Sequence, residues 1–305
     1  MFKSDAILGV FFALLAAVGF SAKAILVKLA YLDHVDAITL LALRMLFAAP
    51  FFVVVAIWIN AQDYHPLKRQ DWVAVLVLGL LGYYLSSFLD FLGLLFITAG
   101  LERLILFLYP TLTVILSAFI YKRPIGRKVI MAMALSYIGI VLVFFHDVGI
   151  SQENAGLSRA DVILGAGLVF ASALSYATYL VGAGHAIQRM GATRFTAYAS
   201  IVASIASLLQ FAVTHSLSSL KLSLRVYELS LGMAIFSTVL PVFLLSYAIR
   251  RIGSASTSLI GSIGPVVTIG LAYVFLNETL SALQIAGTVL VMVGVLSISL
   301  NTRKT

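Results

Sequence analysis

Residues 101–121 read LERLILFLYPTLTVILSAFIY, and residues 256–276 read STSLIGSIGPVVTIGLAYVFL. Each stretch is apolar over about 20 residues, which is the length that a helix needs to cross the hydrocarbon core of a membrane. Neither shows the apolar/polar alternation of a barrel strand. Both carry a proline at the same place, Pro110 and Pro265, 155 residues apart. These stretches therefore predict transmembrane helices in a chain that repeats itself.

The composition of the whole chain points the same way. Of its 305 residues, 62% are hydrophobic and 10% are charged, whereas soluble domains have roughly 45–50% apolar and 25% charged residues. Apolar runs cover residues 6–30, 37–60, 72–96, 101–121, 126–146, 162–183, 195–214, 228–249, 254–276 and 281–300. The sequence thus predicts an all-α integral membrane protein with ten transmembrane helices, and it leaves no room for a soluble catalytic domain.

The distribution of charge indicates orientation rather than a nucleic-acid partner. The formal net charge is +8, but the basic residues lie in short loops between apolar runs and not on one face. With the N-terminus inside, thirteen of the twenty Lys and Arg residues fall on the cytoplasmic side, five on the other side and two within spans. Cytoplasmic loops are enriched in these residues. We therefore expect a multi-pass protein of the plasma membrane, the inner membrane in a prokaryote, with both termini cytoplasmic.

Further matches extend the repeat along the chain. At the same offset, Leu104-Ile105 matches Leu259-Ile260 and Gly139 matches Gly294. With five spans in each copy, the second copy must enter the membrane from the opposite face, as in secondary transporters that work by alternating access. We expect two inverted five-helix repeats around a central cavity. The repeats are assigned to residues 1–146 and 161–305, with residues 147–160 as an outer connecting loop.

Several short motifs recur along the chain in a fixed order, namely Arg44, Tyr109-Pro110, Gly139, Gly264-Pro265, Asn277-Glu278-Thr279-Leu280 and Gly294. Together they resemble the motifs of the drug/metabolite transporter superfamily, EamA type, and the resemblance covers nearly the whole chain. It implies a ten-helix inverted-repeat fold with a central cavity and transport, often export, of amino acids, other metabolites or drugs. The sequence departs from the family at Lys122-Arg123-Pro124-Ile125, where a Glu is common, and at Asp90, where the family usually has an apolar or aromatic residue.

Three ionisable residues, Lys23, Arg44 and Asp90, lie within predicted spans. An unpaired charge at a helix centre costs about 2.5 to 3.5 kcal/mol on insertion scales. All three lie at a similar depth, roughly 10 Å below the outer surface, so a mutual ion-pair cluster is expected. Our hypothesis is that Asp90 exchanges a proton or the ammonium group of a substrate. The alternative is that Asp90 only neutralises Lys23 or Arg44 and holds helices together.

Further residues are assigned to the substrate pathway and to an outer gate. Breaks at Pro110 and Pro265 would mark the midplane site of an inverted-repeat carrier, and simple kinking is the alternative. Glu102 and Arg103 are assigned to the gate, with Glu102 contacting Arg44; a solvated helix end is the alternative. For the small residues and tyrosines, ordinary helix packing remains the alternative. The predicted pathway residues are Lys23, Arg44, Tyr83, Ser86, Ser87, Asp90, Tyr109, Pro110, Thr113, Tyr176, Tyr179, Ser258, Gly261, Ser262 and Pro265.

These patterns predict a secondary transporter of small organic solutes, foremost an exporter of amino acids or related metabolites, with proton coupling as an option. The alternatives are a multidrug or amphiphile exporter and a non-transporting receptor or scaffold. No enzyme is expected, because all five histidines lie in loops or at span ends, which leaves Ser262 without a buried base. We therefore expect no catalytic residue, metal or cofactor. The expected partners are a small-molecule substrate and the lipid bilayer, with a homodimer left open.

Overall fold

The structure is a computed structural model that describes residues 2–62, 66–122, 124–155, 157–261, 263–278 and 281–301. Only the backbone is described for residues 2–6, 146–155, 185, 246, 249–250, 253–256, 258–259 and 298–301. All regular secondary structure in these ranges is helical. Long apolar runs form helices because a helix satisfies its own backbone hydrogen bonds where lipid offers none.

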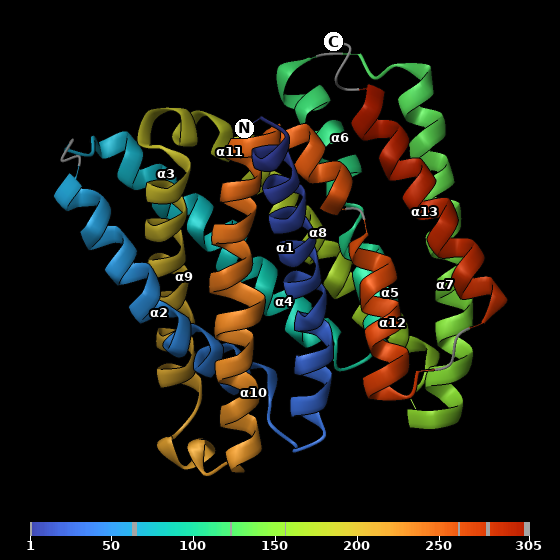
Figure 1. The fold of residues 1–305 in the computed structure, drawn as a ribbon. Helices are drawn as coiled ribbons and strands as arrows, with labels where there is room; N and C mark the ends of the chain where they lie inside the picture. The colour runs from blue at the N-terminus through green and yellow to red at the C-terminus, as the bar shows by residue number, and fades with distance from the viewer. Residues whose placement is uncertain are drawn as a thin grey trace.

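The helices follow one another with short connections (Figure 1). In the first part of the chain they are α1 (Phe2–Tyr31), α2 (Ala37–Gln62), α3 (Arg69–Gly79), the π-helical segment η1 (Leu80–Leu85), α4 (Ser86–Gly93), α5 (Ala99–Leu106), α6 (Tyr109–Tyr121) and α7 (Arg127–Ala155). The second part contains α8 (Arg159–Met190), α9 (Ala192–Thr214), the 3₁₀ turn η2 (Leu217–Leu220), α10 (Leu224–Ala234), the π-helical segment η3 (Ile235–Val239), α11 (Leu240–Gly261), α12 (Gly264–Leu276) and α13 (Ala282–Asn301).

The described residues include eight helical stretches that are long and apolar enough to cross a membrane. Two shorter apolar helices, Gly264–Leu276 and Ala282–Ser297, complete the series. Large apolar side chains remain exposed on the outside, among them Phe119 and Val213, each 84% exposed. Such a surface suits lipid and not water, so the chain is a multi-pass membrane protein.

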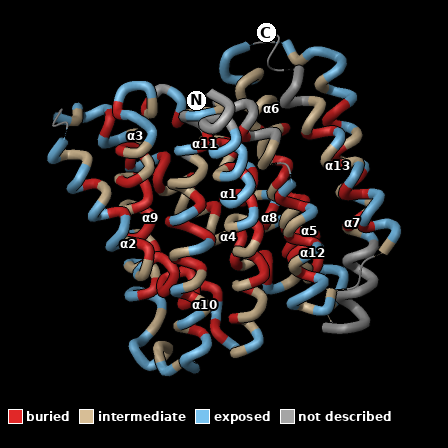
Figure 2. Tube along the Cα trace, in the orientation of Figure 1, coloured by how far each residue is buried: buried red, intermediate tan, exposed pale blue. Residues whose placement is uncertain are grey.

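The two parts of the chain interleave. The most extensive helix pairs are α1 with α11, α2 with α9, α4 with α8, and α7 with α13, and each pair joins one helix from either part. In Figure 1, α1 begins and α13 ends at the same face of the bundle. Figure 2 shows that buried residues gather along the central helices, whereas α2, α7 and α13 expose much of their surface. The core therefore lies between the two parts.

Small residues allow the helices of the two parts to approach closely. A Cβ atom on Gly139 of α7 would lie 2.5 Å from the carbonyl oxygen of Gly287 in α13. On α4, a Cβ on Gly93 would lie 2.9 Å from the carbonyl oxygen of Gly165 in α8. Contacts this short leave no space for a side chain, and such small-residue interfaces are typical of membrane helices.

Local departures from α-helix recur at the offset seen in the sequence. The π-helical segments begin at Leu80 and Ile235, which are 155 residues apart. Lys122 and Asn277, also 155 residues apart, end α6 and α12 in the left-handed conformation, with φ of 52° and 53°. A π-helical segment is rare in proteins, so its presence at both places agrees with an internal repeat.

Two predicted boundaries are wrong. Most of the stretch 147–160, predicted as an outer loop, is helical, because α7 continues to Ala155 and α8 begins at Arg159. The other concerns the eighth and ninth predicted spans. The sequence places a break between spans 228–249 and 254–276, but α11 continues as one helix from Leu240 to Gly261. The stretch that was read as a loop contains Arg251, and its guanidinium lies over the rings of Phe12 and Tyr247, at 5.3 and 5.8 Å from their centroids. These aromatic contacts allow a charged residue to continue the helix. The break comes later, between Gly261 and Gly264.

Candidate functional site

Three charged side chains meet inside the bundle. Lys23 of α1 places its Nζ 2.6 Å from Asp90 Oδ2 of α4 and 3.3 Å from Glu102 Oε1 of α5. The side chains of Lys23, Asp90 and Glu102 are 15%, 2% and 0% exposed. We call these three residues the ion cluster. A buried charge persists only when it is paired, so one ammonium group shared by two carboxylates is its central feature.

Helix ends position both carboxylates. Asp90 lies one turn before the end of α4, and Glu102 lies in the first turn of α5. Thr98 caps α5, since its hydroxyl accepts the N–H of Leu101 at 3.1 Å. The positive end of a helix dipole favours an acidic residue in the first turn. The break between α4 and α5 therefore turns two acidic side chains towards the same lysine.

Glu278 holds the start of α5 from the other part of the chain. Its Oε1 accepts the backbone N–H of Ala99 at 3.0 Å. Burial raises the pKa of the Glu278 carboxyl, while hydrogen bonds from the N–H groups of Ala99 and Gly100 and the charge of Lys28 act in the opposite direction. Glu278 belongs to the Asn-Glu-Thr-Leu motif, so this motif now has a structural role next to the ion cluster.

The sequence predicted that Arg44 belongs to the same ion-pair cluster, but Arg44 lies apart from it and bonds to the second part of the chain. Its Nε donates to Thr238 Oγ1 at 2.9 Å, and its guanidinium carbon lies 5.5 Å from the centre of the Phe91 ring. Thr238 belongs to η3 and also donates to the Met233 carbonyl five residues earlier, at 3.0 Å. The π-helical segment thus places the Thr238 hydroxyl where it accepts a hydrogen bond from Arg44.

The structure differs from the predicted gate. Glu102 is fully buried and pairs with Lys23, and no contact between Glu102 and Arg44 is present among the described residues. The alternative interpretation of Glu102 as part of a solvated helix end is also wrong, because its side chain is buried. The reason is that the turn before α5 points the first-turn side chains inward. Arg103 lies along α12, where its Nη2 would be 2.7 Å from a Cβ on Gly264.

Some polar atoms of these side chains make no hydrogen bond within the described part of the chain. They are Arg44 Nη1 and Arg103 Nε, whereas the carboxyl groups of Asp90 and Glu102 are close enough to share a hydrogen bond with each other. Buried polar atoms in folded proteins nearly always have a partner. The guanidinium groups of Arg44 and Arg103 therefore retain donors for a further polar group.

A row of aromatic residues joins the third, fourth and sixth apolar segments. The hydroxyl groups of Tyr83 and Tyr179 lie 3.0 Å apart, and their ring centroids are separated by 5.2 Å. Tyr176 stacks on Tyr179 at 5.5 Å and meets the edge of Tyr109 at 5.3 Å. The structure thus brings together four predicted pathway residues. Ordinary packing of aromatic side chains between helices produces the same edge-on and stacked contacts.

Serines of α8 use the carbonyl groups near η1. Ser172 donates to the Ser86 carbonyl at 2.6 Å, and Ser175 donates to the Leu81 carbonyl at 2.8 Å. The Ser86 hydroxyl donates to the Gly82 carbonyl of η1, and Ser87 is only partly buried. These predicted pathway serines therefore lie at a helix contact.

Pro110 and Pro265 do not kink continuous helices. Each is the second residue of a helix, α6 and α12, and a short break precedes it. Proline suits the first turn, where its missing N–H would have no partner in the helix. The Gly264 carbonyl before Pro265 accepts a hydrogen bond from Ser21 of α1 at 3.0 Å. The predicted interruptions are thus true helix breaks.

Three further predicted positions complete the survey. Thr113 bonds to the Tyr109 carbonyl within α6 at 2.7 Å, so its hydroxyl is used inside its own helix. Gly261 is the last residue of α11. Ser262 and the side chain of Ser258 lie outside the described residues.

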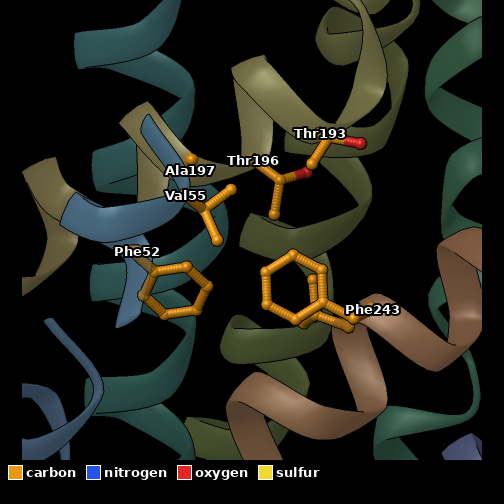
Figure 3. Close-up of a pocket in the computed structure, with 7 residues that line it drawn as sticks. Phe52, Val55, Thr193, Thr196, Ala197 and Phe243 are labelled. Carbon is orange, nitrogen blue, oxygen red and sulfur yellow. The ribbon is translucent and has the colours of Figure 1, made fainter. Parts of the chain in front are cut away.

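Two pockets lie between described helices, and no residue of the predicted pathway lines either of them. The first is a narrow gap between α2, α9 and α11 that leaves no room for a water molecule. In Figure 3, Phe52 and Phe243 lie across from one another, with Val55 and Thr196 above them. The second pocket, at the ends of α2, α3 and α9, is larger and polar.

Comparison with known proteins defines the class. The chain is 30% identical to an "Uncharacterized transporter YcbK" of Bacillus subtilis (strain 168), over 93% of this chain and 90% of the relative. It is 25% identical to a "Probable amino-acid metabolite efflux pump" of Salmonella typhimurium (strain LT2), over 93% and 92% of the two chains. The relatives are named as transporters and not as enzymes, so this protein is a membrane transporter.

The family follows from a match that occurs twice. Residues 7–145 and 163–300 each match the EamA-like transporter family. The chain belongs to this family, as the motifs predicted. A crystal structure with 18% sequence identity covers 99% of this chain and 97% of its own, with a TM-score of 0.63, which supports the fold alone.

Proposed function

We propose that this protein is a secondary transporter that exports amino acids or related small metabolites by alternating access. The observation that carries the proposal is the ion cluster, in which two buried carboxylates share the single ammonium group of Lys23. An amino acid has an ammonium group that Asp90 or Glu102 can accept and a carboxylate that Arg44 can bind. The printed name of the Salmonella relative agrees with this substrate class.

The proposal includes a fold of ten spans in two inverted repeats, residues 1–146 and 161–305. It is supported by the double family match and by the π-helical segments and left-handed residues that recur 155 residues apart. The breaks before Pro110 and Pro265 then lie at equivalent places, where carriers of this design bind substrate. The tyrosine row from Tyr83 to Tyr109 would line the path away from the cluster.

Proton coupling would use the same three side chains. The Lys23 ammonium group pairs with the carboxylates of both Asp90 and Glu102. When a proton binds to Asp90, that carboxylate loses its charge and Lys23 remains paired with Glu102. Release of that proton restores the carboxylate, which then competes for Lys23 or for a substrate ammonium group. In this scheme the proton and the substrate occupy the cluster in alternation, which is the requirement for exchange.

The test is counterflow of labelled amino acids in proteoliposomes. We expect Asp90→Asn and Glu102→Gln each to lower the exchange rate at least about tenfold, the effect of about 1.4 kcal/mol. Matched controls are Asp33→Asn and Glu228→Gln, two changes at residues outside the cluster. If both cluster variants are folded and exchange amino acids at the wild-type rate, the ion cluster has no role in the transport cycle.

The same vesicles separate the alternatives. Exchange of amphiphilic cations in place of amino acids would favour a multidrug exporter, and absence of flux with either class would favour a scaffold. For coupling, an imposed pH gradient should drive uptake by the wild type and not by Asp90→Asn. A gradient effect that persists in Asp90→Asn would contradict proton exchange at Asp90.

A further inference from the structure

Helix α5 is short, and breaks in the helical structure bound it on both sides. It spans Ala99–Leu106, between the end of α4 at Gly93 and the start of α6 at Tyr109. Its first turn carries Glu102 of the ion cluster. Segments of a protein turn against one another at a few residues in loops or at the ends of elements. α5 therefore has a hinge available at each of its ends.

The start of α5 depends on the other part of the chain. The N–H groups at the start of a helix have no partner within that helix. The Thr98 hydroxyl accepts the N–H of Leu101 at 3.1 Å. The Glu278 carboxylate accepts the N–H of Ala99, at 3.0 Å, and that of Gly100. Because Glu278 follows α12, contact between the two parts of the chain completes the start of α5.

This contact is buried and closely packed. Ala99 is 0% exposed, and Gln284 of α13 is 4% exposed. A Cβ atom on Gly100 would lie 2.6 Å from Gln284 Nε2 and 3.7 Å from Glu278 Oε2. Lys28, in the last turn of α1, adds its positive charge next to the Glu278 carboxylate. Helices from both parts of the chain therefore meet around this carboxylate.

The contact lies at the face of the bundle opposite the two ends of the chain. In Figure 1, α1 begins and α13 ends at the same face. The last turn of α1, with Lys28, and the first turn of α13, with Gln284, therefore lie at the other face. Glu278 lies between α12 and α13 at this face, so it closes the bundle on one side only.

The same contact cannot form at the face that holds the two ends of the chain. At the repeat offset of 155 residues, Glu278 corresponds to Arg123. A guanidinium group has donors and no acceptor, so it cannot bond to the N–H groups of a helix start. Ala99 corresponds to position 254, through which α11 passes without a break. The two faces of the bundle are therefore closed by different means.

We propose that Glu278 and the start of α5 form a latch that keeps one face of the transporter closed. The proposal rests on alternating access, the mechanism proposed above. When Glu278 releases the N–H groups of Ala99 and Gly100, α5 turns at its two hinges and this face opens. Glu102 moves with α5 and leaves Lys23. The latch thus links the ion cluster to the opening of this face.

The experiment measures how fast a water-soluble thiol reagent reacts with a cysteine in place of Ala99. The chain has no cysteine of its own, and Ala99→Cys keeps the backbone N–H that Glu278 holds. The purified full-length protein is placed in lipid nanodiscs, where the reagent reaches both faces, so orientation does not affect the result. Without a further substitution we expect slow labelling, because Ala99 is 0% exposed.

Two substitutions of Glu278 separate the reach of the side chain from its charge. Glu278→Asp keeps the charge but withdraws the carboxylate from α5, so labelling should become about tenfold faster or more. Glu278→Gln keeps an oxygen within reach and removes the charge, so labelling should rise by about threefold at most. The control Glu228→Asp makes the same change at an exposed residue of α10 and should leave the rate unchanged.

A second reporter separates opening of the latch from loss of the fold. Ala203→Cys in α9 is also at a residue with 0% exposure, and it should stay unlabelled with Glu278→Asp. Equal labelling of both reporters in that variant would show that Glu278 holds the whole fold and would overturn the latch.

Three further results would also overturn it: fast labelling of Ala99→Cys alone, equal rates with Glu278→Asp and Glu278→Gln, or faster labelling with Glu228→Asp. No substrate is needed for these measurements. If the wild type exchanges no amino acid but the labelling follows the expected pattern, the proposed function fails and the latch stands. If exchange occurs and the labelling does not change with Glu278→Asp, the latch fails and the proposed function stands.

Discussion

At the scale of single residues, Lys23 has the most consequential position in the molecule. Its ammonium group is the only cation found within 4 Å of Asp90 or Glu102 in the described residues. Two buried carboxylates rely on it, and removing one partner of a buried pair leaves an uncompensated charge. The cluster is therefore both a functional candidate and a determinant of stability.

We expect Lys23→Met to lower the free energy of unfolding by about 3 to 5 kcal/mol, because Asp90 and Glu102 then lose their counter-charge. The measurement is thermal unfolding of the purified protein in detergent. The triple variant Lys23→Met, Asp90→Asn, Glu102→Gln removes all three charges and should recover most of the loss. If the triple variant is no more stable than Lys23→Met, loss of packing around Lys23 explains the effect instead.

The free energy of unfolding should depend on pH through Glu278, and its contribution should fall as the pH rises. Its folded-state pKa is raised, with burial as the largest cause, so the folded protein binds this proton more tightly than the unfolded chain. The resulting contribution is fully present below the ordinary glutamate pKa of about 4.3 and is lost as the pH rises through the raised pKa.

The corresponding prediction compares the wild type with Glu278→Gln. Glutamine can still accept the Ala99 N–H and does not titrate, so the variant should gain stability relative to the wild type as the pH rises from about 4 towards neutrality. Melting temperatures across this range give the difference directly. A difference that stays constant with pH would mean that the Glu278 pKa is the same in the folded and unfolded states.

At the scale of helices, close contacts between small residues decide which elements pair. The contact of α7 with α13 depends on Gly139 and Gly287, whose backbones touch. By contrast, a Cβ on Gly167 of α8 would meet no atom within 4 Å. The same substitution should therefore have opposite effects at the two places.

We expect Gly139→Ala to destabilise the protein by about 1 to 3 kcal/mol, because the added methyl group forces α7 and α13 apart. Gly167→Ala makes the same chemical change in open space and should be neutral or stabilising by up to about 1 kcal/mol. Unfolding of both variants in detergent is the measurement. Equal stability of the two would show that α7 and α13 adjust without cost.

At the scale of the whole molecule, the faces of the bundle indicate its orientation. α1 begins, α13 ends and α3 begins at one face, and η2 lies at the opposite face (Figure 1). The distribution of Lys and Arg predicts that the first face is cytoplasmic. The chain contains no cysteine, so single cysteines can report this directly.

We expect Lys68→Cys, next to the start of α3, to be shielded from a membrane-impermeant thiol reagent in intact cells, and Ser218→Cys in η2 to be labelled. Both residues are exposed, so burial cannot account for a difference. After the cells are opened, both positions should react. Labelling of Lys68→Cys alone in intact cells would reverse the proposed orientation.

The sequence by itself determined the class of protein, the positions of most helices and the family. Hydropathy and motifs are local properties, and each helix in lipid must satisfy its own backbone, so apolar runs were sufficient evidence. Charge and depth also predicted an ion-pair cluster of Lys23, Arg44 and Asp90, because a buried charge needs a partner. The choice of Lys23 as the partner of Asp90, and the place of Arg44 outside the cluster, came from the structure.

Only the tertiary structure decided which side chains meet. The burial of Glu102, the bond from Arg44 to Thr238 and the capping of α5 by Glu278 join residues 79, 194 and 179 positions apart. Each depends on how helices from the two parts of the chain cross, and on where α4 ends and α5 begins. Apolar runs carry no information on those crossings, because lipid-facing and core-facing segments are equally apolar.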